Sequence, residues 1–133
     1  MTRKQIEHIN AANEELLVEG NAAAAAEYFA EDYVVHITDQ DRRGLKLVEG
    51  FVRSIRRSFP DLTVEVEVLL ASKDRVAWQR TLRGTHQAPF QGFPATGRKL
   101  TWRDLLVSRF EDDVIAEEWA NSDLAEQLLR ARS

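Results

Sequence analysis

The chain of 133 residues is 44% hydrophobic and 30% charged, with a net charge of −4 at pH 7. This length and balance are typical of one globular domain, and no linker rich in proline, glycine or serine interrupts the chain. We therefore expect a single domain over residues 1–133. The negative charge argues against a nucleic-acid partner, because surfaces that bind nucleic acid are basic.

Cysteine is absent, which excludes disulfides, thiolate metal sites and cysteine catalysis. The absence is compatible with the reducing cytoplasm, which is the localisation that we expect. No apolar run approaches the roughly 18 residues that a membrane span requires, and the first residues lack the apolar core of a signal peptide. We therefore expect no membrane partner.

The three histidines are too scattered to suggest a metal site. The chain also lacks a phosphate-binding loop, a dinucleotide-binding fingerprint and the nucleophile elbow of serine hydrolases. We therefore expect neither a metal nor a cofactor.

The first half of the chain predicts three helices. The first begins near Thr2 and ends at Gly20, and the second runs from Asn21 to about Phe29. The third is the most clearly amphipathic, and Pro60 ends it. The apolar stripe of the third helix consists of Leu47, Val48, Phe51, Val52, Ile55 and Phe59.

Two further segments of this half are less regular. A short strand is predicted over about 33–38, followed by a loop over 39–44. The only basic cluster of the sequence falls on the third helix, away from its apolar stripe, and is most simply a solvated face. It consists of Arg53, Arg56 and Arg57.

Beyond Pro60 the apolar residues alternate, which predicts strands. A loop rich in glycine and proline separates the second of these strands from the third. A short helix is predicted after Asp123. The four strands are predicted at about 62–70, 75–85, 100–110 and 114–119.

This order of elements indicates an α+β fold, with helices gathered first and antiparallel strands afterwards. We expect a cone-shaped α+β barrel, in which a curved antiparallel sheet and three N-terminal helices enclose a pocket. The pocket is where we look for chemistry.

Asp104 is the first candidate for that chemistry. It is the only charged residue on the even-numbered face of its strand, and an ionised carboxylate among apolar groups must be paired, hydrated or shifted to a higher pKa. A carboxylate with a raised pKa suits general acid/base catalysis near neutral pH. The even-numbered face consists of Leu100, Trp102, Asp104, Leu106, Ser108 and Phe110.

Two other interpretations of Asp104 stay open. The preceding strand carries Trp78 and Arg80 on one face, so Arg80 could meet Asp104 across the hairpin. Such an ion pair would lower the pKa of Asp104 and make it a weaker base. Alternatively, the Asp104 position is simply exposed.

The histidines give weaker candidates. His86 stands where the second long strand ends, and it could orient a substrate carbonyl or share a proton, although a histidine there is often a turn residue. His36, on the short early strand, could contact a substrate or be an exposed or core-edge side chain.

Three further side chains could bind a substrate. Trp102 and Trp119 are flat groups suited to a planar ligand, although aromatic residues are usually part of the core. Asp123 could contact a ligand, but its place at a helix start favours a capping role.

Several motifs resemble the SnoaL-like polyketide cyclase family of the nuclear transport factor 2-like superfamily. The resemblance covers nearly the whole chain, and it departs from the family pattern at Asp112-Asp113, where the family usually has Asp-Gly. The motifs are Phe59-Pro60-Asp61-Leu62, Gly84-Thr85-His86, the segment from Phe90 to Arg98 that ends in Thr96-Gly97-Arg98, and Arg109-Phe110 followed by Ala116-Glu117-Glu118-Trp119 and Asp123.

The resemblance implies a cofactor-free enzyme that closes a ring of a polyketide ester by intramolecular aldol condensation, or a related isomerase or lyase. It implies that Asp104 is the acid/base residue and His86 a pocket histidine, which we expect to hydrogen-bond the developing oxyanion. The substrate would be a small hydrophobic carbonyl compound, with Trp78 and Trp102 stacked on it. Because the family also contains cofactor-independent hydroxylases and members with no known reaction, a hydroxylase and a non-catalytic binding or dimerisation module remain alternatives.

The odd-numbered face of the third long strand predicts an assembly. It carries Leu105 and Val107 between Arg103 and Arg109, opposite the expected pocket. Apolar residues on an outward face usually need a cover, and relatives of this fold often dimerise through it. We therefore expect a homodimer.

Overall fold

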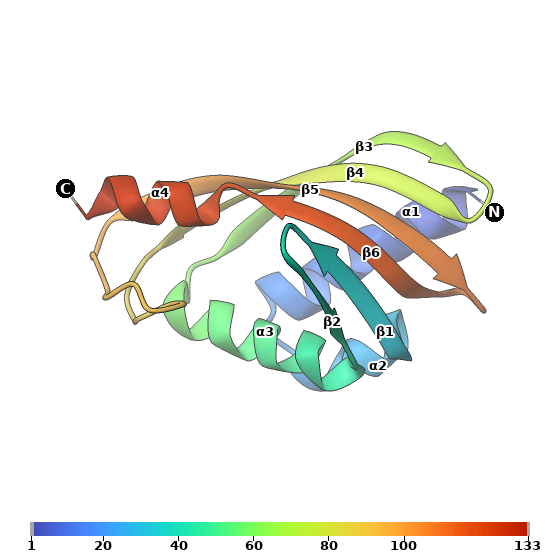
Figure 1. Ribbon diagram of the computed structural model, residues 1–133, viewed down its shortest axis with the longest axis horizontal. Coiled ribbons are helices and arrows are strands. Elements are labelled where there is room, and N and C mark those ends of the chain that lie inside the picture. Colours follow the sequence, from blue (N-terminus) through green and yellow to red (C-terminus); the bar gives the residue numbers. More distant parts are fainter. Residues whose placement is uncertain (1, 133) are drawn as a thin grey trace.

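The computed structural model describes residues 2–132. The helices and strands alternate little along the chain, since most helices precede most strands (Figure 1). In chain order the elements are α1 (Thr2–Ala12), the π-helical turn η1 (Asn13–Val18), the 3₁₀ turn η2 (Ala22–Ala24), α2 (Ala25–Tyr28), β1 (Phe29–Ile37), β2 (Gln40–Arg43), α3 (Leu45–Ser58), β3 (Thr63–Ser72), β4 (Arg75–Thr85), β5 (Lys99–Glu111), β6 (Val114–Ser122) and α4 (Leu124–Ala131).

The strands form one curved sheet in the order β2-β1-β6-β5-β4-β3, which stays open because β2 and β3 are its two edges. The α+β cone expected from the sequence is therefore confirmed. Its sheet is mixed rather than wholly antiparallel, because β1 pairs with β6 in parallel. No tight turn joins these two strands, so nothing forces them to run in opposite directions.

The early part of the chain differs from the sequence prediction in two places. The segment predicted as a loop over 39–44 contains β2, which pairs with β1 as a hairpin. The second helix is only a 3₁₀ turn and one turn of α2, because the chain becomes extended at Phe29. Phe29 and Tyr33 of the extended β1 pack edge to face, with ring centres 5.0 Å apart, in the wall of the molecule's cavity.

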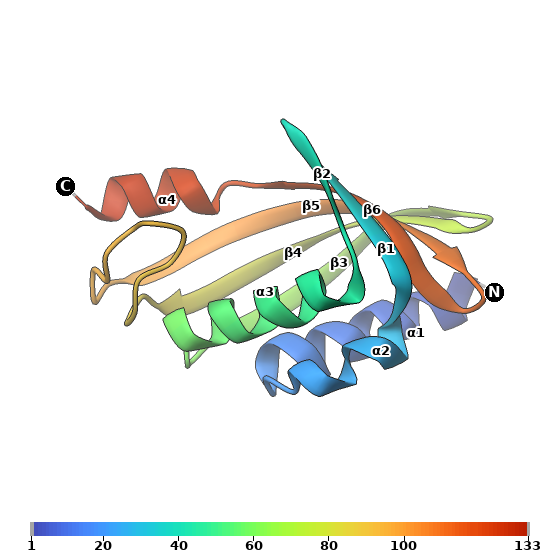
Figure 2. The same cartoon turned by 60° about the horizontal axis from the view of Figure 1, so that its bottom comes forward.

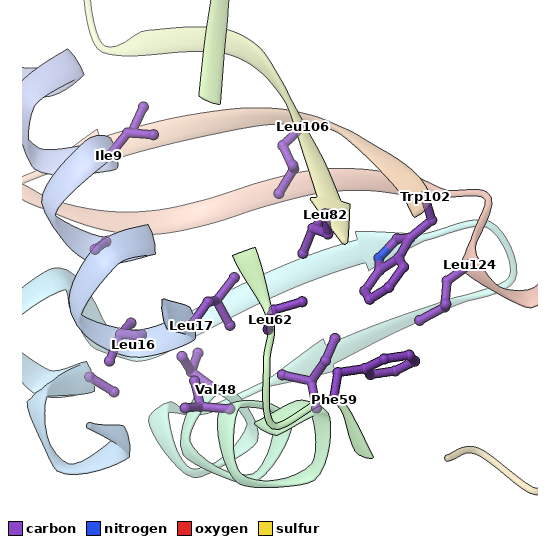
Figure 3. Packing of buried hydrophobic residues seen from close by; sticks show 14 of the residues in the cluster. Ile9, Leu16, Leu17, Val48, Phe59, Leu62, Leu82, Trp102, Leu106 and Leu124 are labelled. Atoms are coloured by element: carbon purple, nitrogen blue, oxygen red, sulfur yellow. The ribbon is translucent and has the colours of Figure 1, made fainter. Parts of the chain in front are cut away.

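The helices α1, α2 and α3 lie across the concave face of the sheet, whereas α4 extends beyond the end of β6 (Figure 2). Alternation in β5 turns its even-numbered residues inward, as the sequence predicts, and all of them are buried. Burying a large apolar side chain stabilises the fold by about 1.5–3 kcal/mol. Figure 3 shows such side chains of the sheet (Leu82, Trp102, Leu106) opposite those of the helices (Leu16, Leu17, Val48).

No helix within residues 2–132 is long and apolar enough to cross a membrane.

Candidate functional site

A cavity of about 770 Å³ lies between the concave face of the sheet and the helices. Side chains of α1, η1 and α3 line one side of it, and side chains of β1, β4, β5 and β6 line the other. Most of the lining is apolar, as in sites for small organic molecules, whose volumes run from about 300 to 1,000 Å³. The polar residues on which the site depends are Asn13, Tyr33, Arg80, Asp104 and Glu118.

Asp104 and Arg80 form an ion pair in the wall of this cavity. The β4–β5 register places them directly opposite each other, and Arg80 Nε donates to Asp104 Oδ2 over 2.8 Å. Arg80 Nη1 donates to Asn13 Oδ1, also over 2.8 Å. Asn13 belongs to the π-helical turn that follows α1. The pairing that the sequence left open is therefore present.

The second oxygen of Asp104 has a different environment. Asp104 Oδ1 is buried and has no hydrogen-bond partner among the described residues. Leaving a buried acceptor unpaired costs about 1–3 kcal/mol. Arg80 thus holds only one of the two carboxylate oxygens.

A chain of hydrogen bonds crosses four neighbouring strands beside this pair. The Trp78 indole donates to Ser108 Oγ (2.8 Å), Ser108 donates to Glu118 Oε2 (2.6 Å), and Tyr33 Oη donates to Glu118 Oε1 (2.6 Å). Glu118 is only 5% exposed. Its carboxyl is therefore a second acid at the cavity wall, held by neutral groups rather than by a cation.

Burial raises the pKa of Glu118, and the Asp104 charge acts in the same direction. The hydrogen bonds from Ser108 and Tyr33 and the charge of Arg80 oppose this shift without cancelling it. Burial and the Glu118 charge also raise the pKa of the Tyr33 hydroxyl. Both groups therefore favour the protonated form more than they would in water.

Glu118 and Tyr33 were not found from the sequence. In β6 the residues that face inward do not alternate regularly, because a bulge interrupts the β5–β6 register opposite Arg109 and Phe110. Ile115 and Glu118 both line the cavity, so strict alternation from Ile115 would turn Glu117 and Trp119 inward instead. The bulge therefore reverses which side chains of β6 beyond it face the cavity.

Trp119 and His36, expected in the pocket, therefore lie on the outer face of the sheet. The His36 ring stacks on Trp119 with centres 5.2 Å apart, and the Arg75 guanidinium lies 4.9 Å from the Trp119 ring. His36 also pairs with Asp41 (2.7 Å) and Glu117 (2.6 Å), and these hydrogen bonds raise the pKa of His36. Neither residue lines the cavity.

His86 also lies outside the cavity lining. Its ring is fully buried and stacks on Phe59 with centres 5.3 Å apart, while its main chain bonds Gly97 and Arg98. The backbone N–H of Thr96 donates to His86 Nδ1 at 3.3 Å, and burial lowers the pKa of the ring. His86 therefore fastens the β4–β5 loop from a position outside the cavity lining.

Asp123, the last candidate, is likewise not in the cavity wall. Its carboxylate accepts from the backbone N–H of Arg103 over 2.7 Å and from Gln127 Nε2 over 3.3 Å. It ties β5 to the start of α4. By contrast, Trp78, Arg80, Trp102 and Asp104 line the cavity together, as expected.

Within residues 2–132, no group of three or more histidine, aspartate or glutamate side chains could hold a metal ion.

Comparison with known proteins gives one family and many similar folds. The family model of SnoaL-like polyketide cyclases matches residues 7–130. No curated protein matches the chain.

Three solved structures illustrate the similarity. IdmH from Streptomyces antibioticus, provisionally described as a polyketide cyclase, is 29% identical, with a TM-score of 0.77 over 96% of this chain and 97% of that one. A provisional polyketide cyclase from Acidithiobacillus ferrooxidans is 25% identical, with a TM-score of 0.84 over 97% and 94%. AclR from Streptomyces galilaeus, provisionally a hydroxylase, is 24% identical, with a TM-score of 0.83 over 99% and 83%.

Proposed function

The chain belongs to the SnoaL-like polyketide cyclase family, and we propose that it is an acid/base enzyme that catalyses an aldol-type ring closure of a small hydrophobic carbonyl compound. The observation that carries this proposal is the half-paired carboxylate of Asp104 in the wall of a cavity of about 770 Å³. A general base needs an oxygen that is free to accept a proton, and Oδ1 is such an oxygen.

The reaction begins when Asp104 Oδ1 removes a proton from a carbon next to a carbonyl. The electron pair of the broken C–H bond passes to the carbonyl oxygen and gives an enolate. The enolate carbon then attacks a second carbonyl of the same molecule, and the protonated carboxyl of Asp104 returns its proton to the new alkoxide. Trp78 and Trp102 offer flat walls to the substrate.

Arg80 positions the base for this step. Its hydrogen bond to Oδ2 fixes one oxygen of the carboxylate and leaves Oδ1 for the substrate. Carboxylates are weak bases, so the substrate proton must be acidic. A carbon flanked by two carbonyls, as in polyketide chains, meets this requirement.

The test does not require the natural substrate. α-Tetralone, a bicyclic aryl ketone, exchanges its α-protons slowly in D₂O, and nuclear magnetic resonance follows the exchange. We expect the protein to accelerate exchange and Asp104→Asn to lose this acceleration by about 10²–10⁴-fold.

The matched control is Asp32→Asn, which neutralises an exposed aspartate of β1 and should exchange protons like the parent. Equal rates for the parent and Asp104→Asn would sink the assignment of Asp104. If the ketone binds but the parent does not accelerate its exchange, the protein is a binding module instead.

A cofactor-independent hydroxylase is the second candidate, favoured by the similarity to AclR, whose own activity is provisional. It would use the same carboxylate to form a carbanion, whose electron pair adds to dioxygen to make a C–O bond. Protonation then gives a hydroperoxide, which an external two-electron reductant such as a thiol would convert to the alcohol and water. Turnover of a polyketide-like ketone that stops under nitrogen would support this candidate over the cyclase.

We also propose a homodimer formed through the outer face of the sheet. Leu105 of β5 is 47% exposed there, and Leu69 and Leu70 of the edge strand β3 are 50% and 69% exposed. The measurement is the mass in solution at micromolar concentration, which we expect to be that of two chains. Leu105→Glu should shift it to that of one chain.

A further inference from the structure

We propose that Tyr33, backed by Glu118, is the group that donates a hydrogen bond to the substrate oxygen on which negative charge develops. This inference rests on the proposed function, because an enolate arises only if the site removes a proton next to a carbonyl. It gives to a residue of the cavity lining the role that the sequence suggested for His86, which lies outside that lining.

The donors and acceptors of the hydrogen-bond chain indicate which of its residues can donate to a bound molecule. An indole N–H can only donate, so Ser108 accepts from Trp78, and it donates its own hydrogen to Glu118 Oε2. At the other end, Tyr33 Oη and Glu118 Oε1 lie 2.6 Å apart. A hydroxyl both donates and accepts, so protonation of Oε1 reverses this bond.

Reversal changes what Tyr33 presents to the cavity. When Glu118 is ionised, the Tyr33 hydroxyl donates its hydrogen to Oε1. When Oε1 carries a proton, that proton is donated to Tyr33 Oη, and the tyrosine hydrogen is released to another acceptor. Tyr33 and Glu118 both line the cavity, so that acceptor can be an oxygen of the bound molecule.

The surroundings favour the protonated state of Glu118. It is buried, and the charged groups that act on it are Arg80 of β4 and Asp104 of β5. Arg80 is already held by Asp104 Oδ2 and Asn13 Oδ1. Glu118 is therefore buried without a direct bond from Arg80, and it favours its protonated form more than a glutamate in water does.

Tyr33 and Asp104 would thus act on different atoms of one substrate. Asp104 Oδ1 takes the proton from carbon, and the Tyr33 O–H stabilises the oxygen that receives the electron pair. Donors placed where negative charge develops are among the largest contributions to catalysis. The ligand class follows from this arrangement: a planar apolar molecule with an enolate or phenolate oxygen.

The test uses 4-nitrophenolate as a stable mimic of an enolate and 4-nitrotoluene as its counterpart without the oxygen. Both quench tryptophan fluorescence, so Trp78 and Trp102 report their binding. We expect Tyr33→Phe to lose about ten- to a hundredfold in affinity for 4-nitrophenolate, because it removes a hydrogen bond to a charged group. Its affinity for 4-nitrotoluene should change less than twofold.

Glu118→Gln separates this role from a structural one. The glutamine oxygen can accept from Ser108 and its NH₂ can donate to Tyr33, so the variant mimics protonated Glu118 and releases the tyrosine hydrogen. We expect its affinity for 4-nitrophenolate to equal or exceed that of the parent. If Tyr33→Phe does not fold, this variant alone decides.

Three outcomes would overturn the inference: unchanged 4-nitrophenolate binding by Tyr33→Phe, an equal loss for both ligands, or a tenfold loss in Glu118→Gln. None of these measurements depends on proton exchange from a ketone. The assignment of Asp104 can therefore fail or succeed separately.

Discussion

Glu117 and Glu118 are neighbours in β6, yet the two faces of the sheet give them opposite properties. On the outer face, hydrogen bonds from His36 and Arg109 lower the pKa of Glu117. On the inner face, burial raises the pKa of Glu118, whose direct partners are the neutral hydroxyls of Tyr33 and Ser108. The comparison teaches that the face of the sheet, and not the residue type, decides the direction in which the pKa of a carboxyl shifts.

The largest effect should come from removing the inner cation. Arg80→Met leaves Asp104 and Glu118 without their shared guanidinium, and breaking a buried pair costs about 3–5 kcal/mol of the free energy of unfolding. The matched outer variant is Arg109→Met, whose partners Glu111 and Glu117 are better hydrated, and it should cost about 0–1 kcal/mol. Urea denaturation measures both, and equal losses would contradict the distinction between the faces.

Asp104→Asn should have a smaller effect on stability. The asparagine oxygen can still accept from Arg80, which also keeps its bond to Asn13, so we expect a loss of about 1–3 kcal/mol. A thermal melt in parallel with Arg80→Met measures the difference. A loss as large as that of Arg80→Met would mean that Asp104 serves mainly as a structural counter-ion.

Glu117 and Glu118 should contribute to the free energy of unfolding with opposite dependence on pH. The pKa of Glu118 is raised in the folded protein, so its contribution to stability is present at low pH and is lost as the pH rises through that pKa. Glu118→Gln should therefore gain stability relative to the parent as the pH rises from about 4, with a slope of at most about 1.4 kcal/mol per pH unit.

The pKa of Glu117 is lowered, so its contribution is present at neutral pH and is lost as the pH falls through that pKa. Glu117→Gln should therefore be less stable than the parent at neutral pH and approach it in acid. Melting temperatures across this pH range give both curves, and curves of the same sign would refute the contrast.

The smallest effect on stability concerns the turn that joins β5 to β6. This turn connects the two strands whose pairing register determines which side chains face the cavity. Asp113 lies in the left-handed region with φ of 66°, where glycine is favoured. Asp113→Gly should stabilise the protein by about 0.5–1 kcal/mol. The control is Asp74→Gly in the β3–β4 turn, because the φ of Asp74 itself is not left-handed. This variant should give no gain in melting temperature.

The inner wall could be predicted from the sequence where alternation is unbroken. In β4 and β5, Trp78, Arg80, Trp102 and Asp104 follow a strict period of two, and the register between these strands has no bulge. Their common cavity followed from that pattern alone. The fold class followed from the order of helices and strands.

The other residues of the site could not be predicted, because their positions depend on tertiary structure that no local sequence pattern encodes. The bulge opposite Arg109 and Phe110 exchanged the faces of β6, so Glu118 replaced Trp119 in the wall. Tyr33 entered the site through the parallel pairing of β1 with β6. His86 was misplaced because the loop beyond it folds back and buries it against Phe59.

That parallel pairing has a consequence for the order in which the protein folds. The Tyr33–Glu118 contact joins residues separated by 85 positions, whereas β3, β4 and β5 connect through neighbouring strands. Closing so long a loop costs more conformational entropy than closing a local hairpin, so we expect the hairpins to form first and this contact to form late. Tyr33→Phe should then speed unfolding and leave the folding rate nearly unchanged, a result expected if the site assembles late.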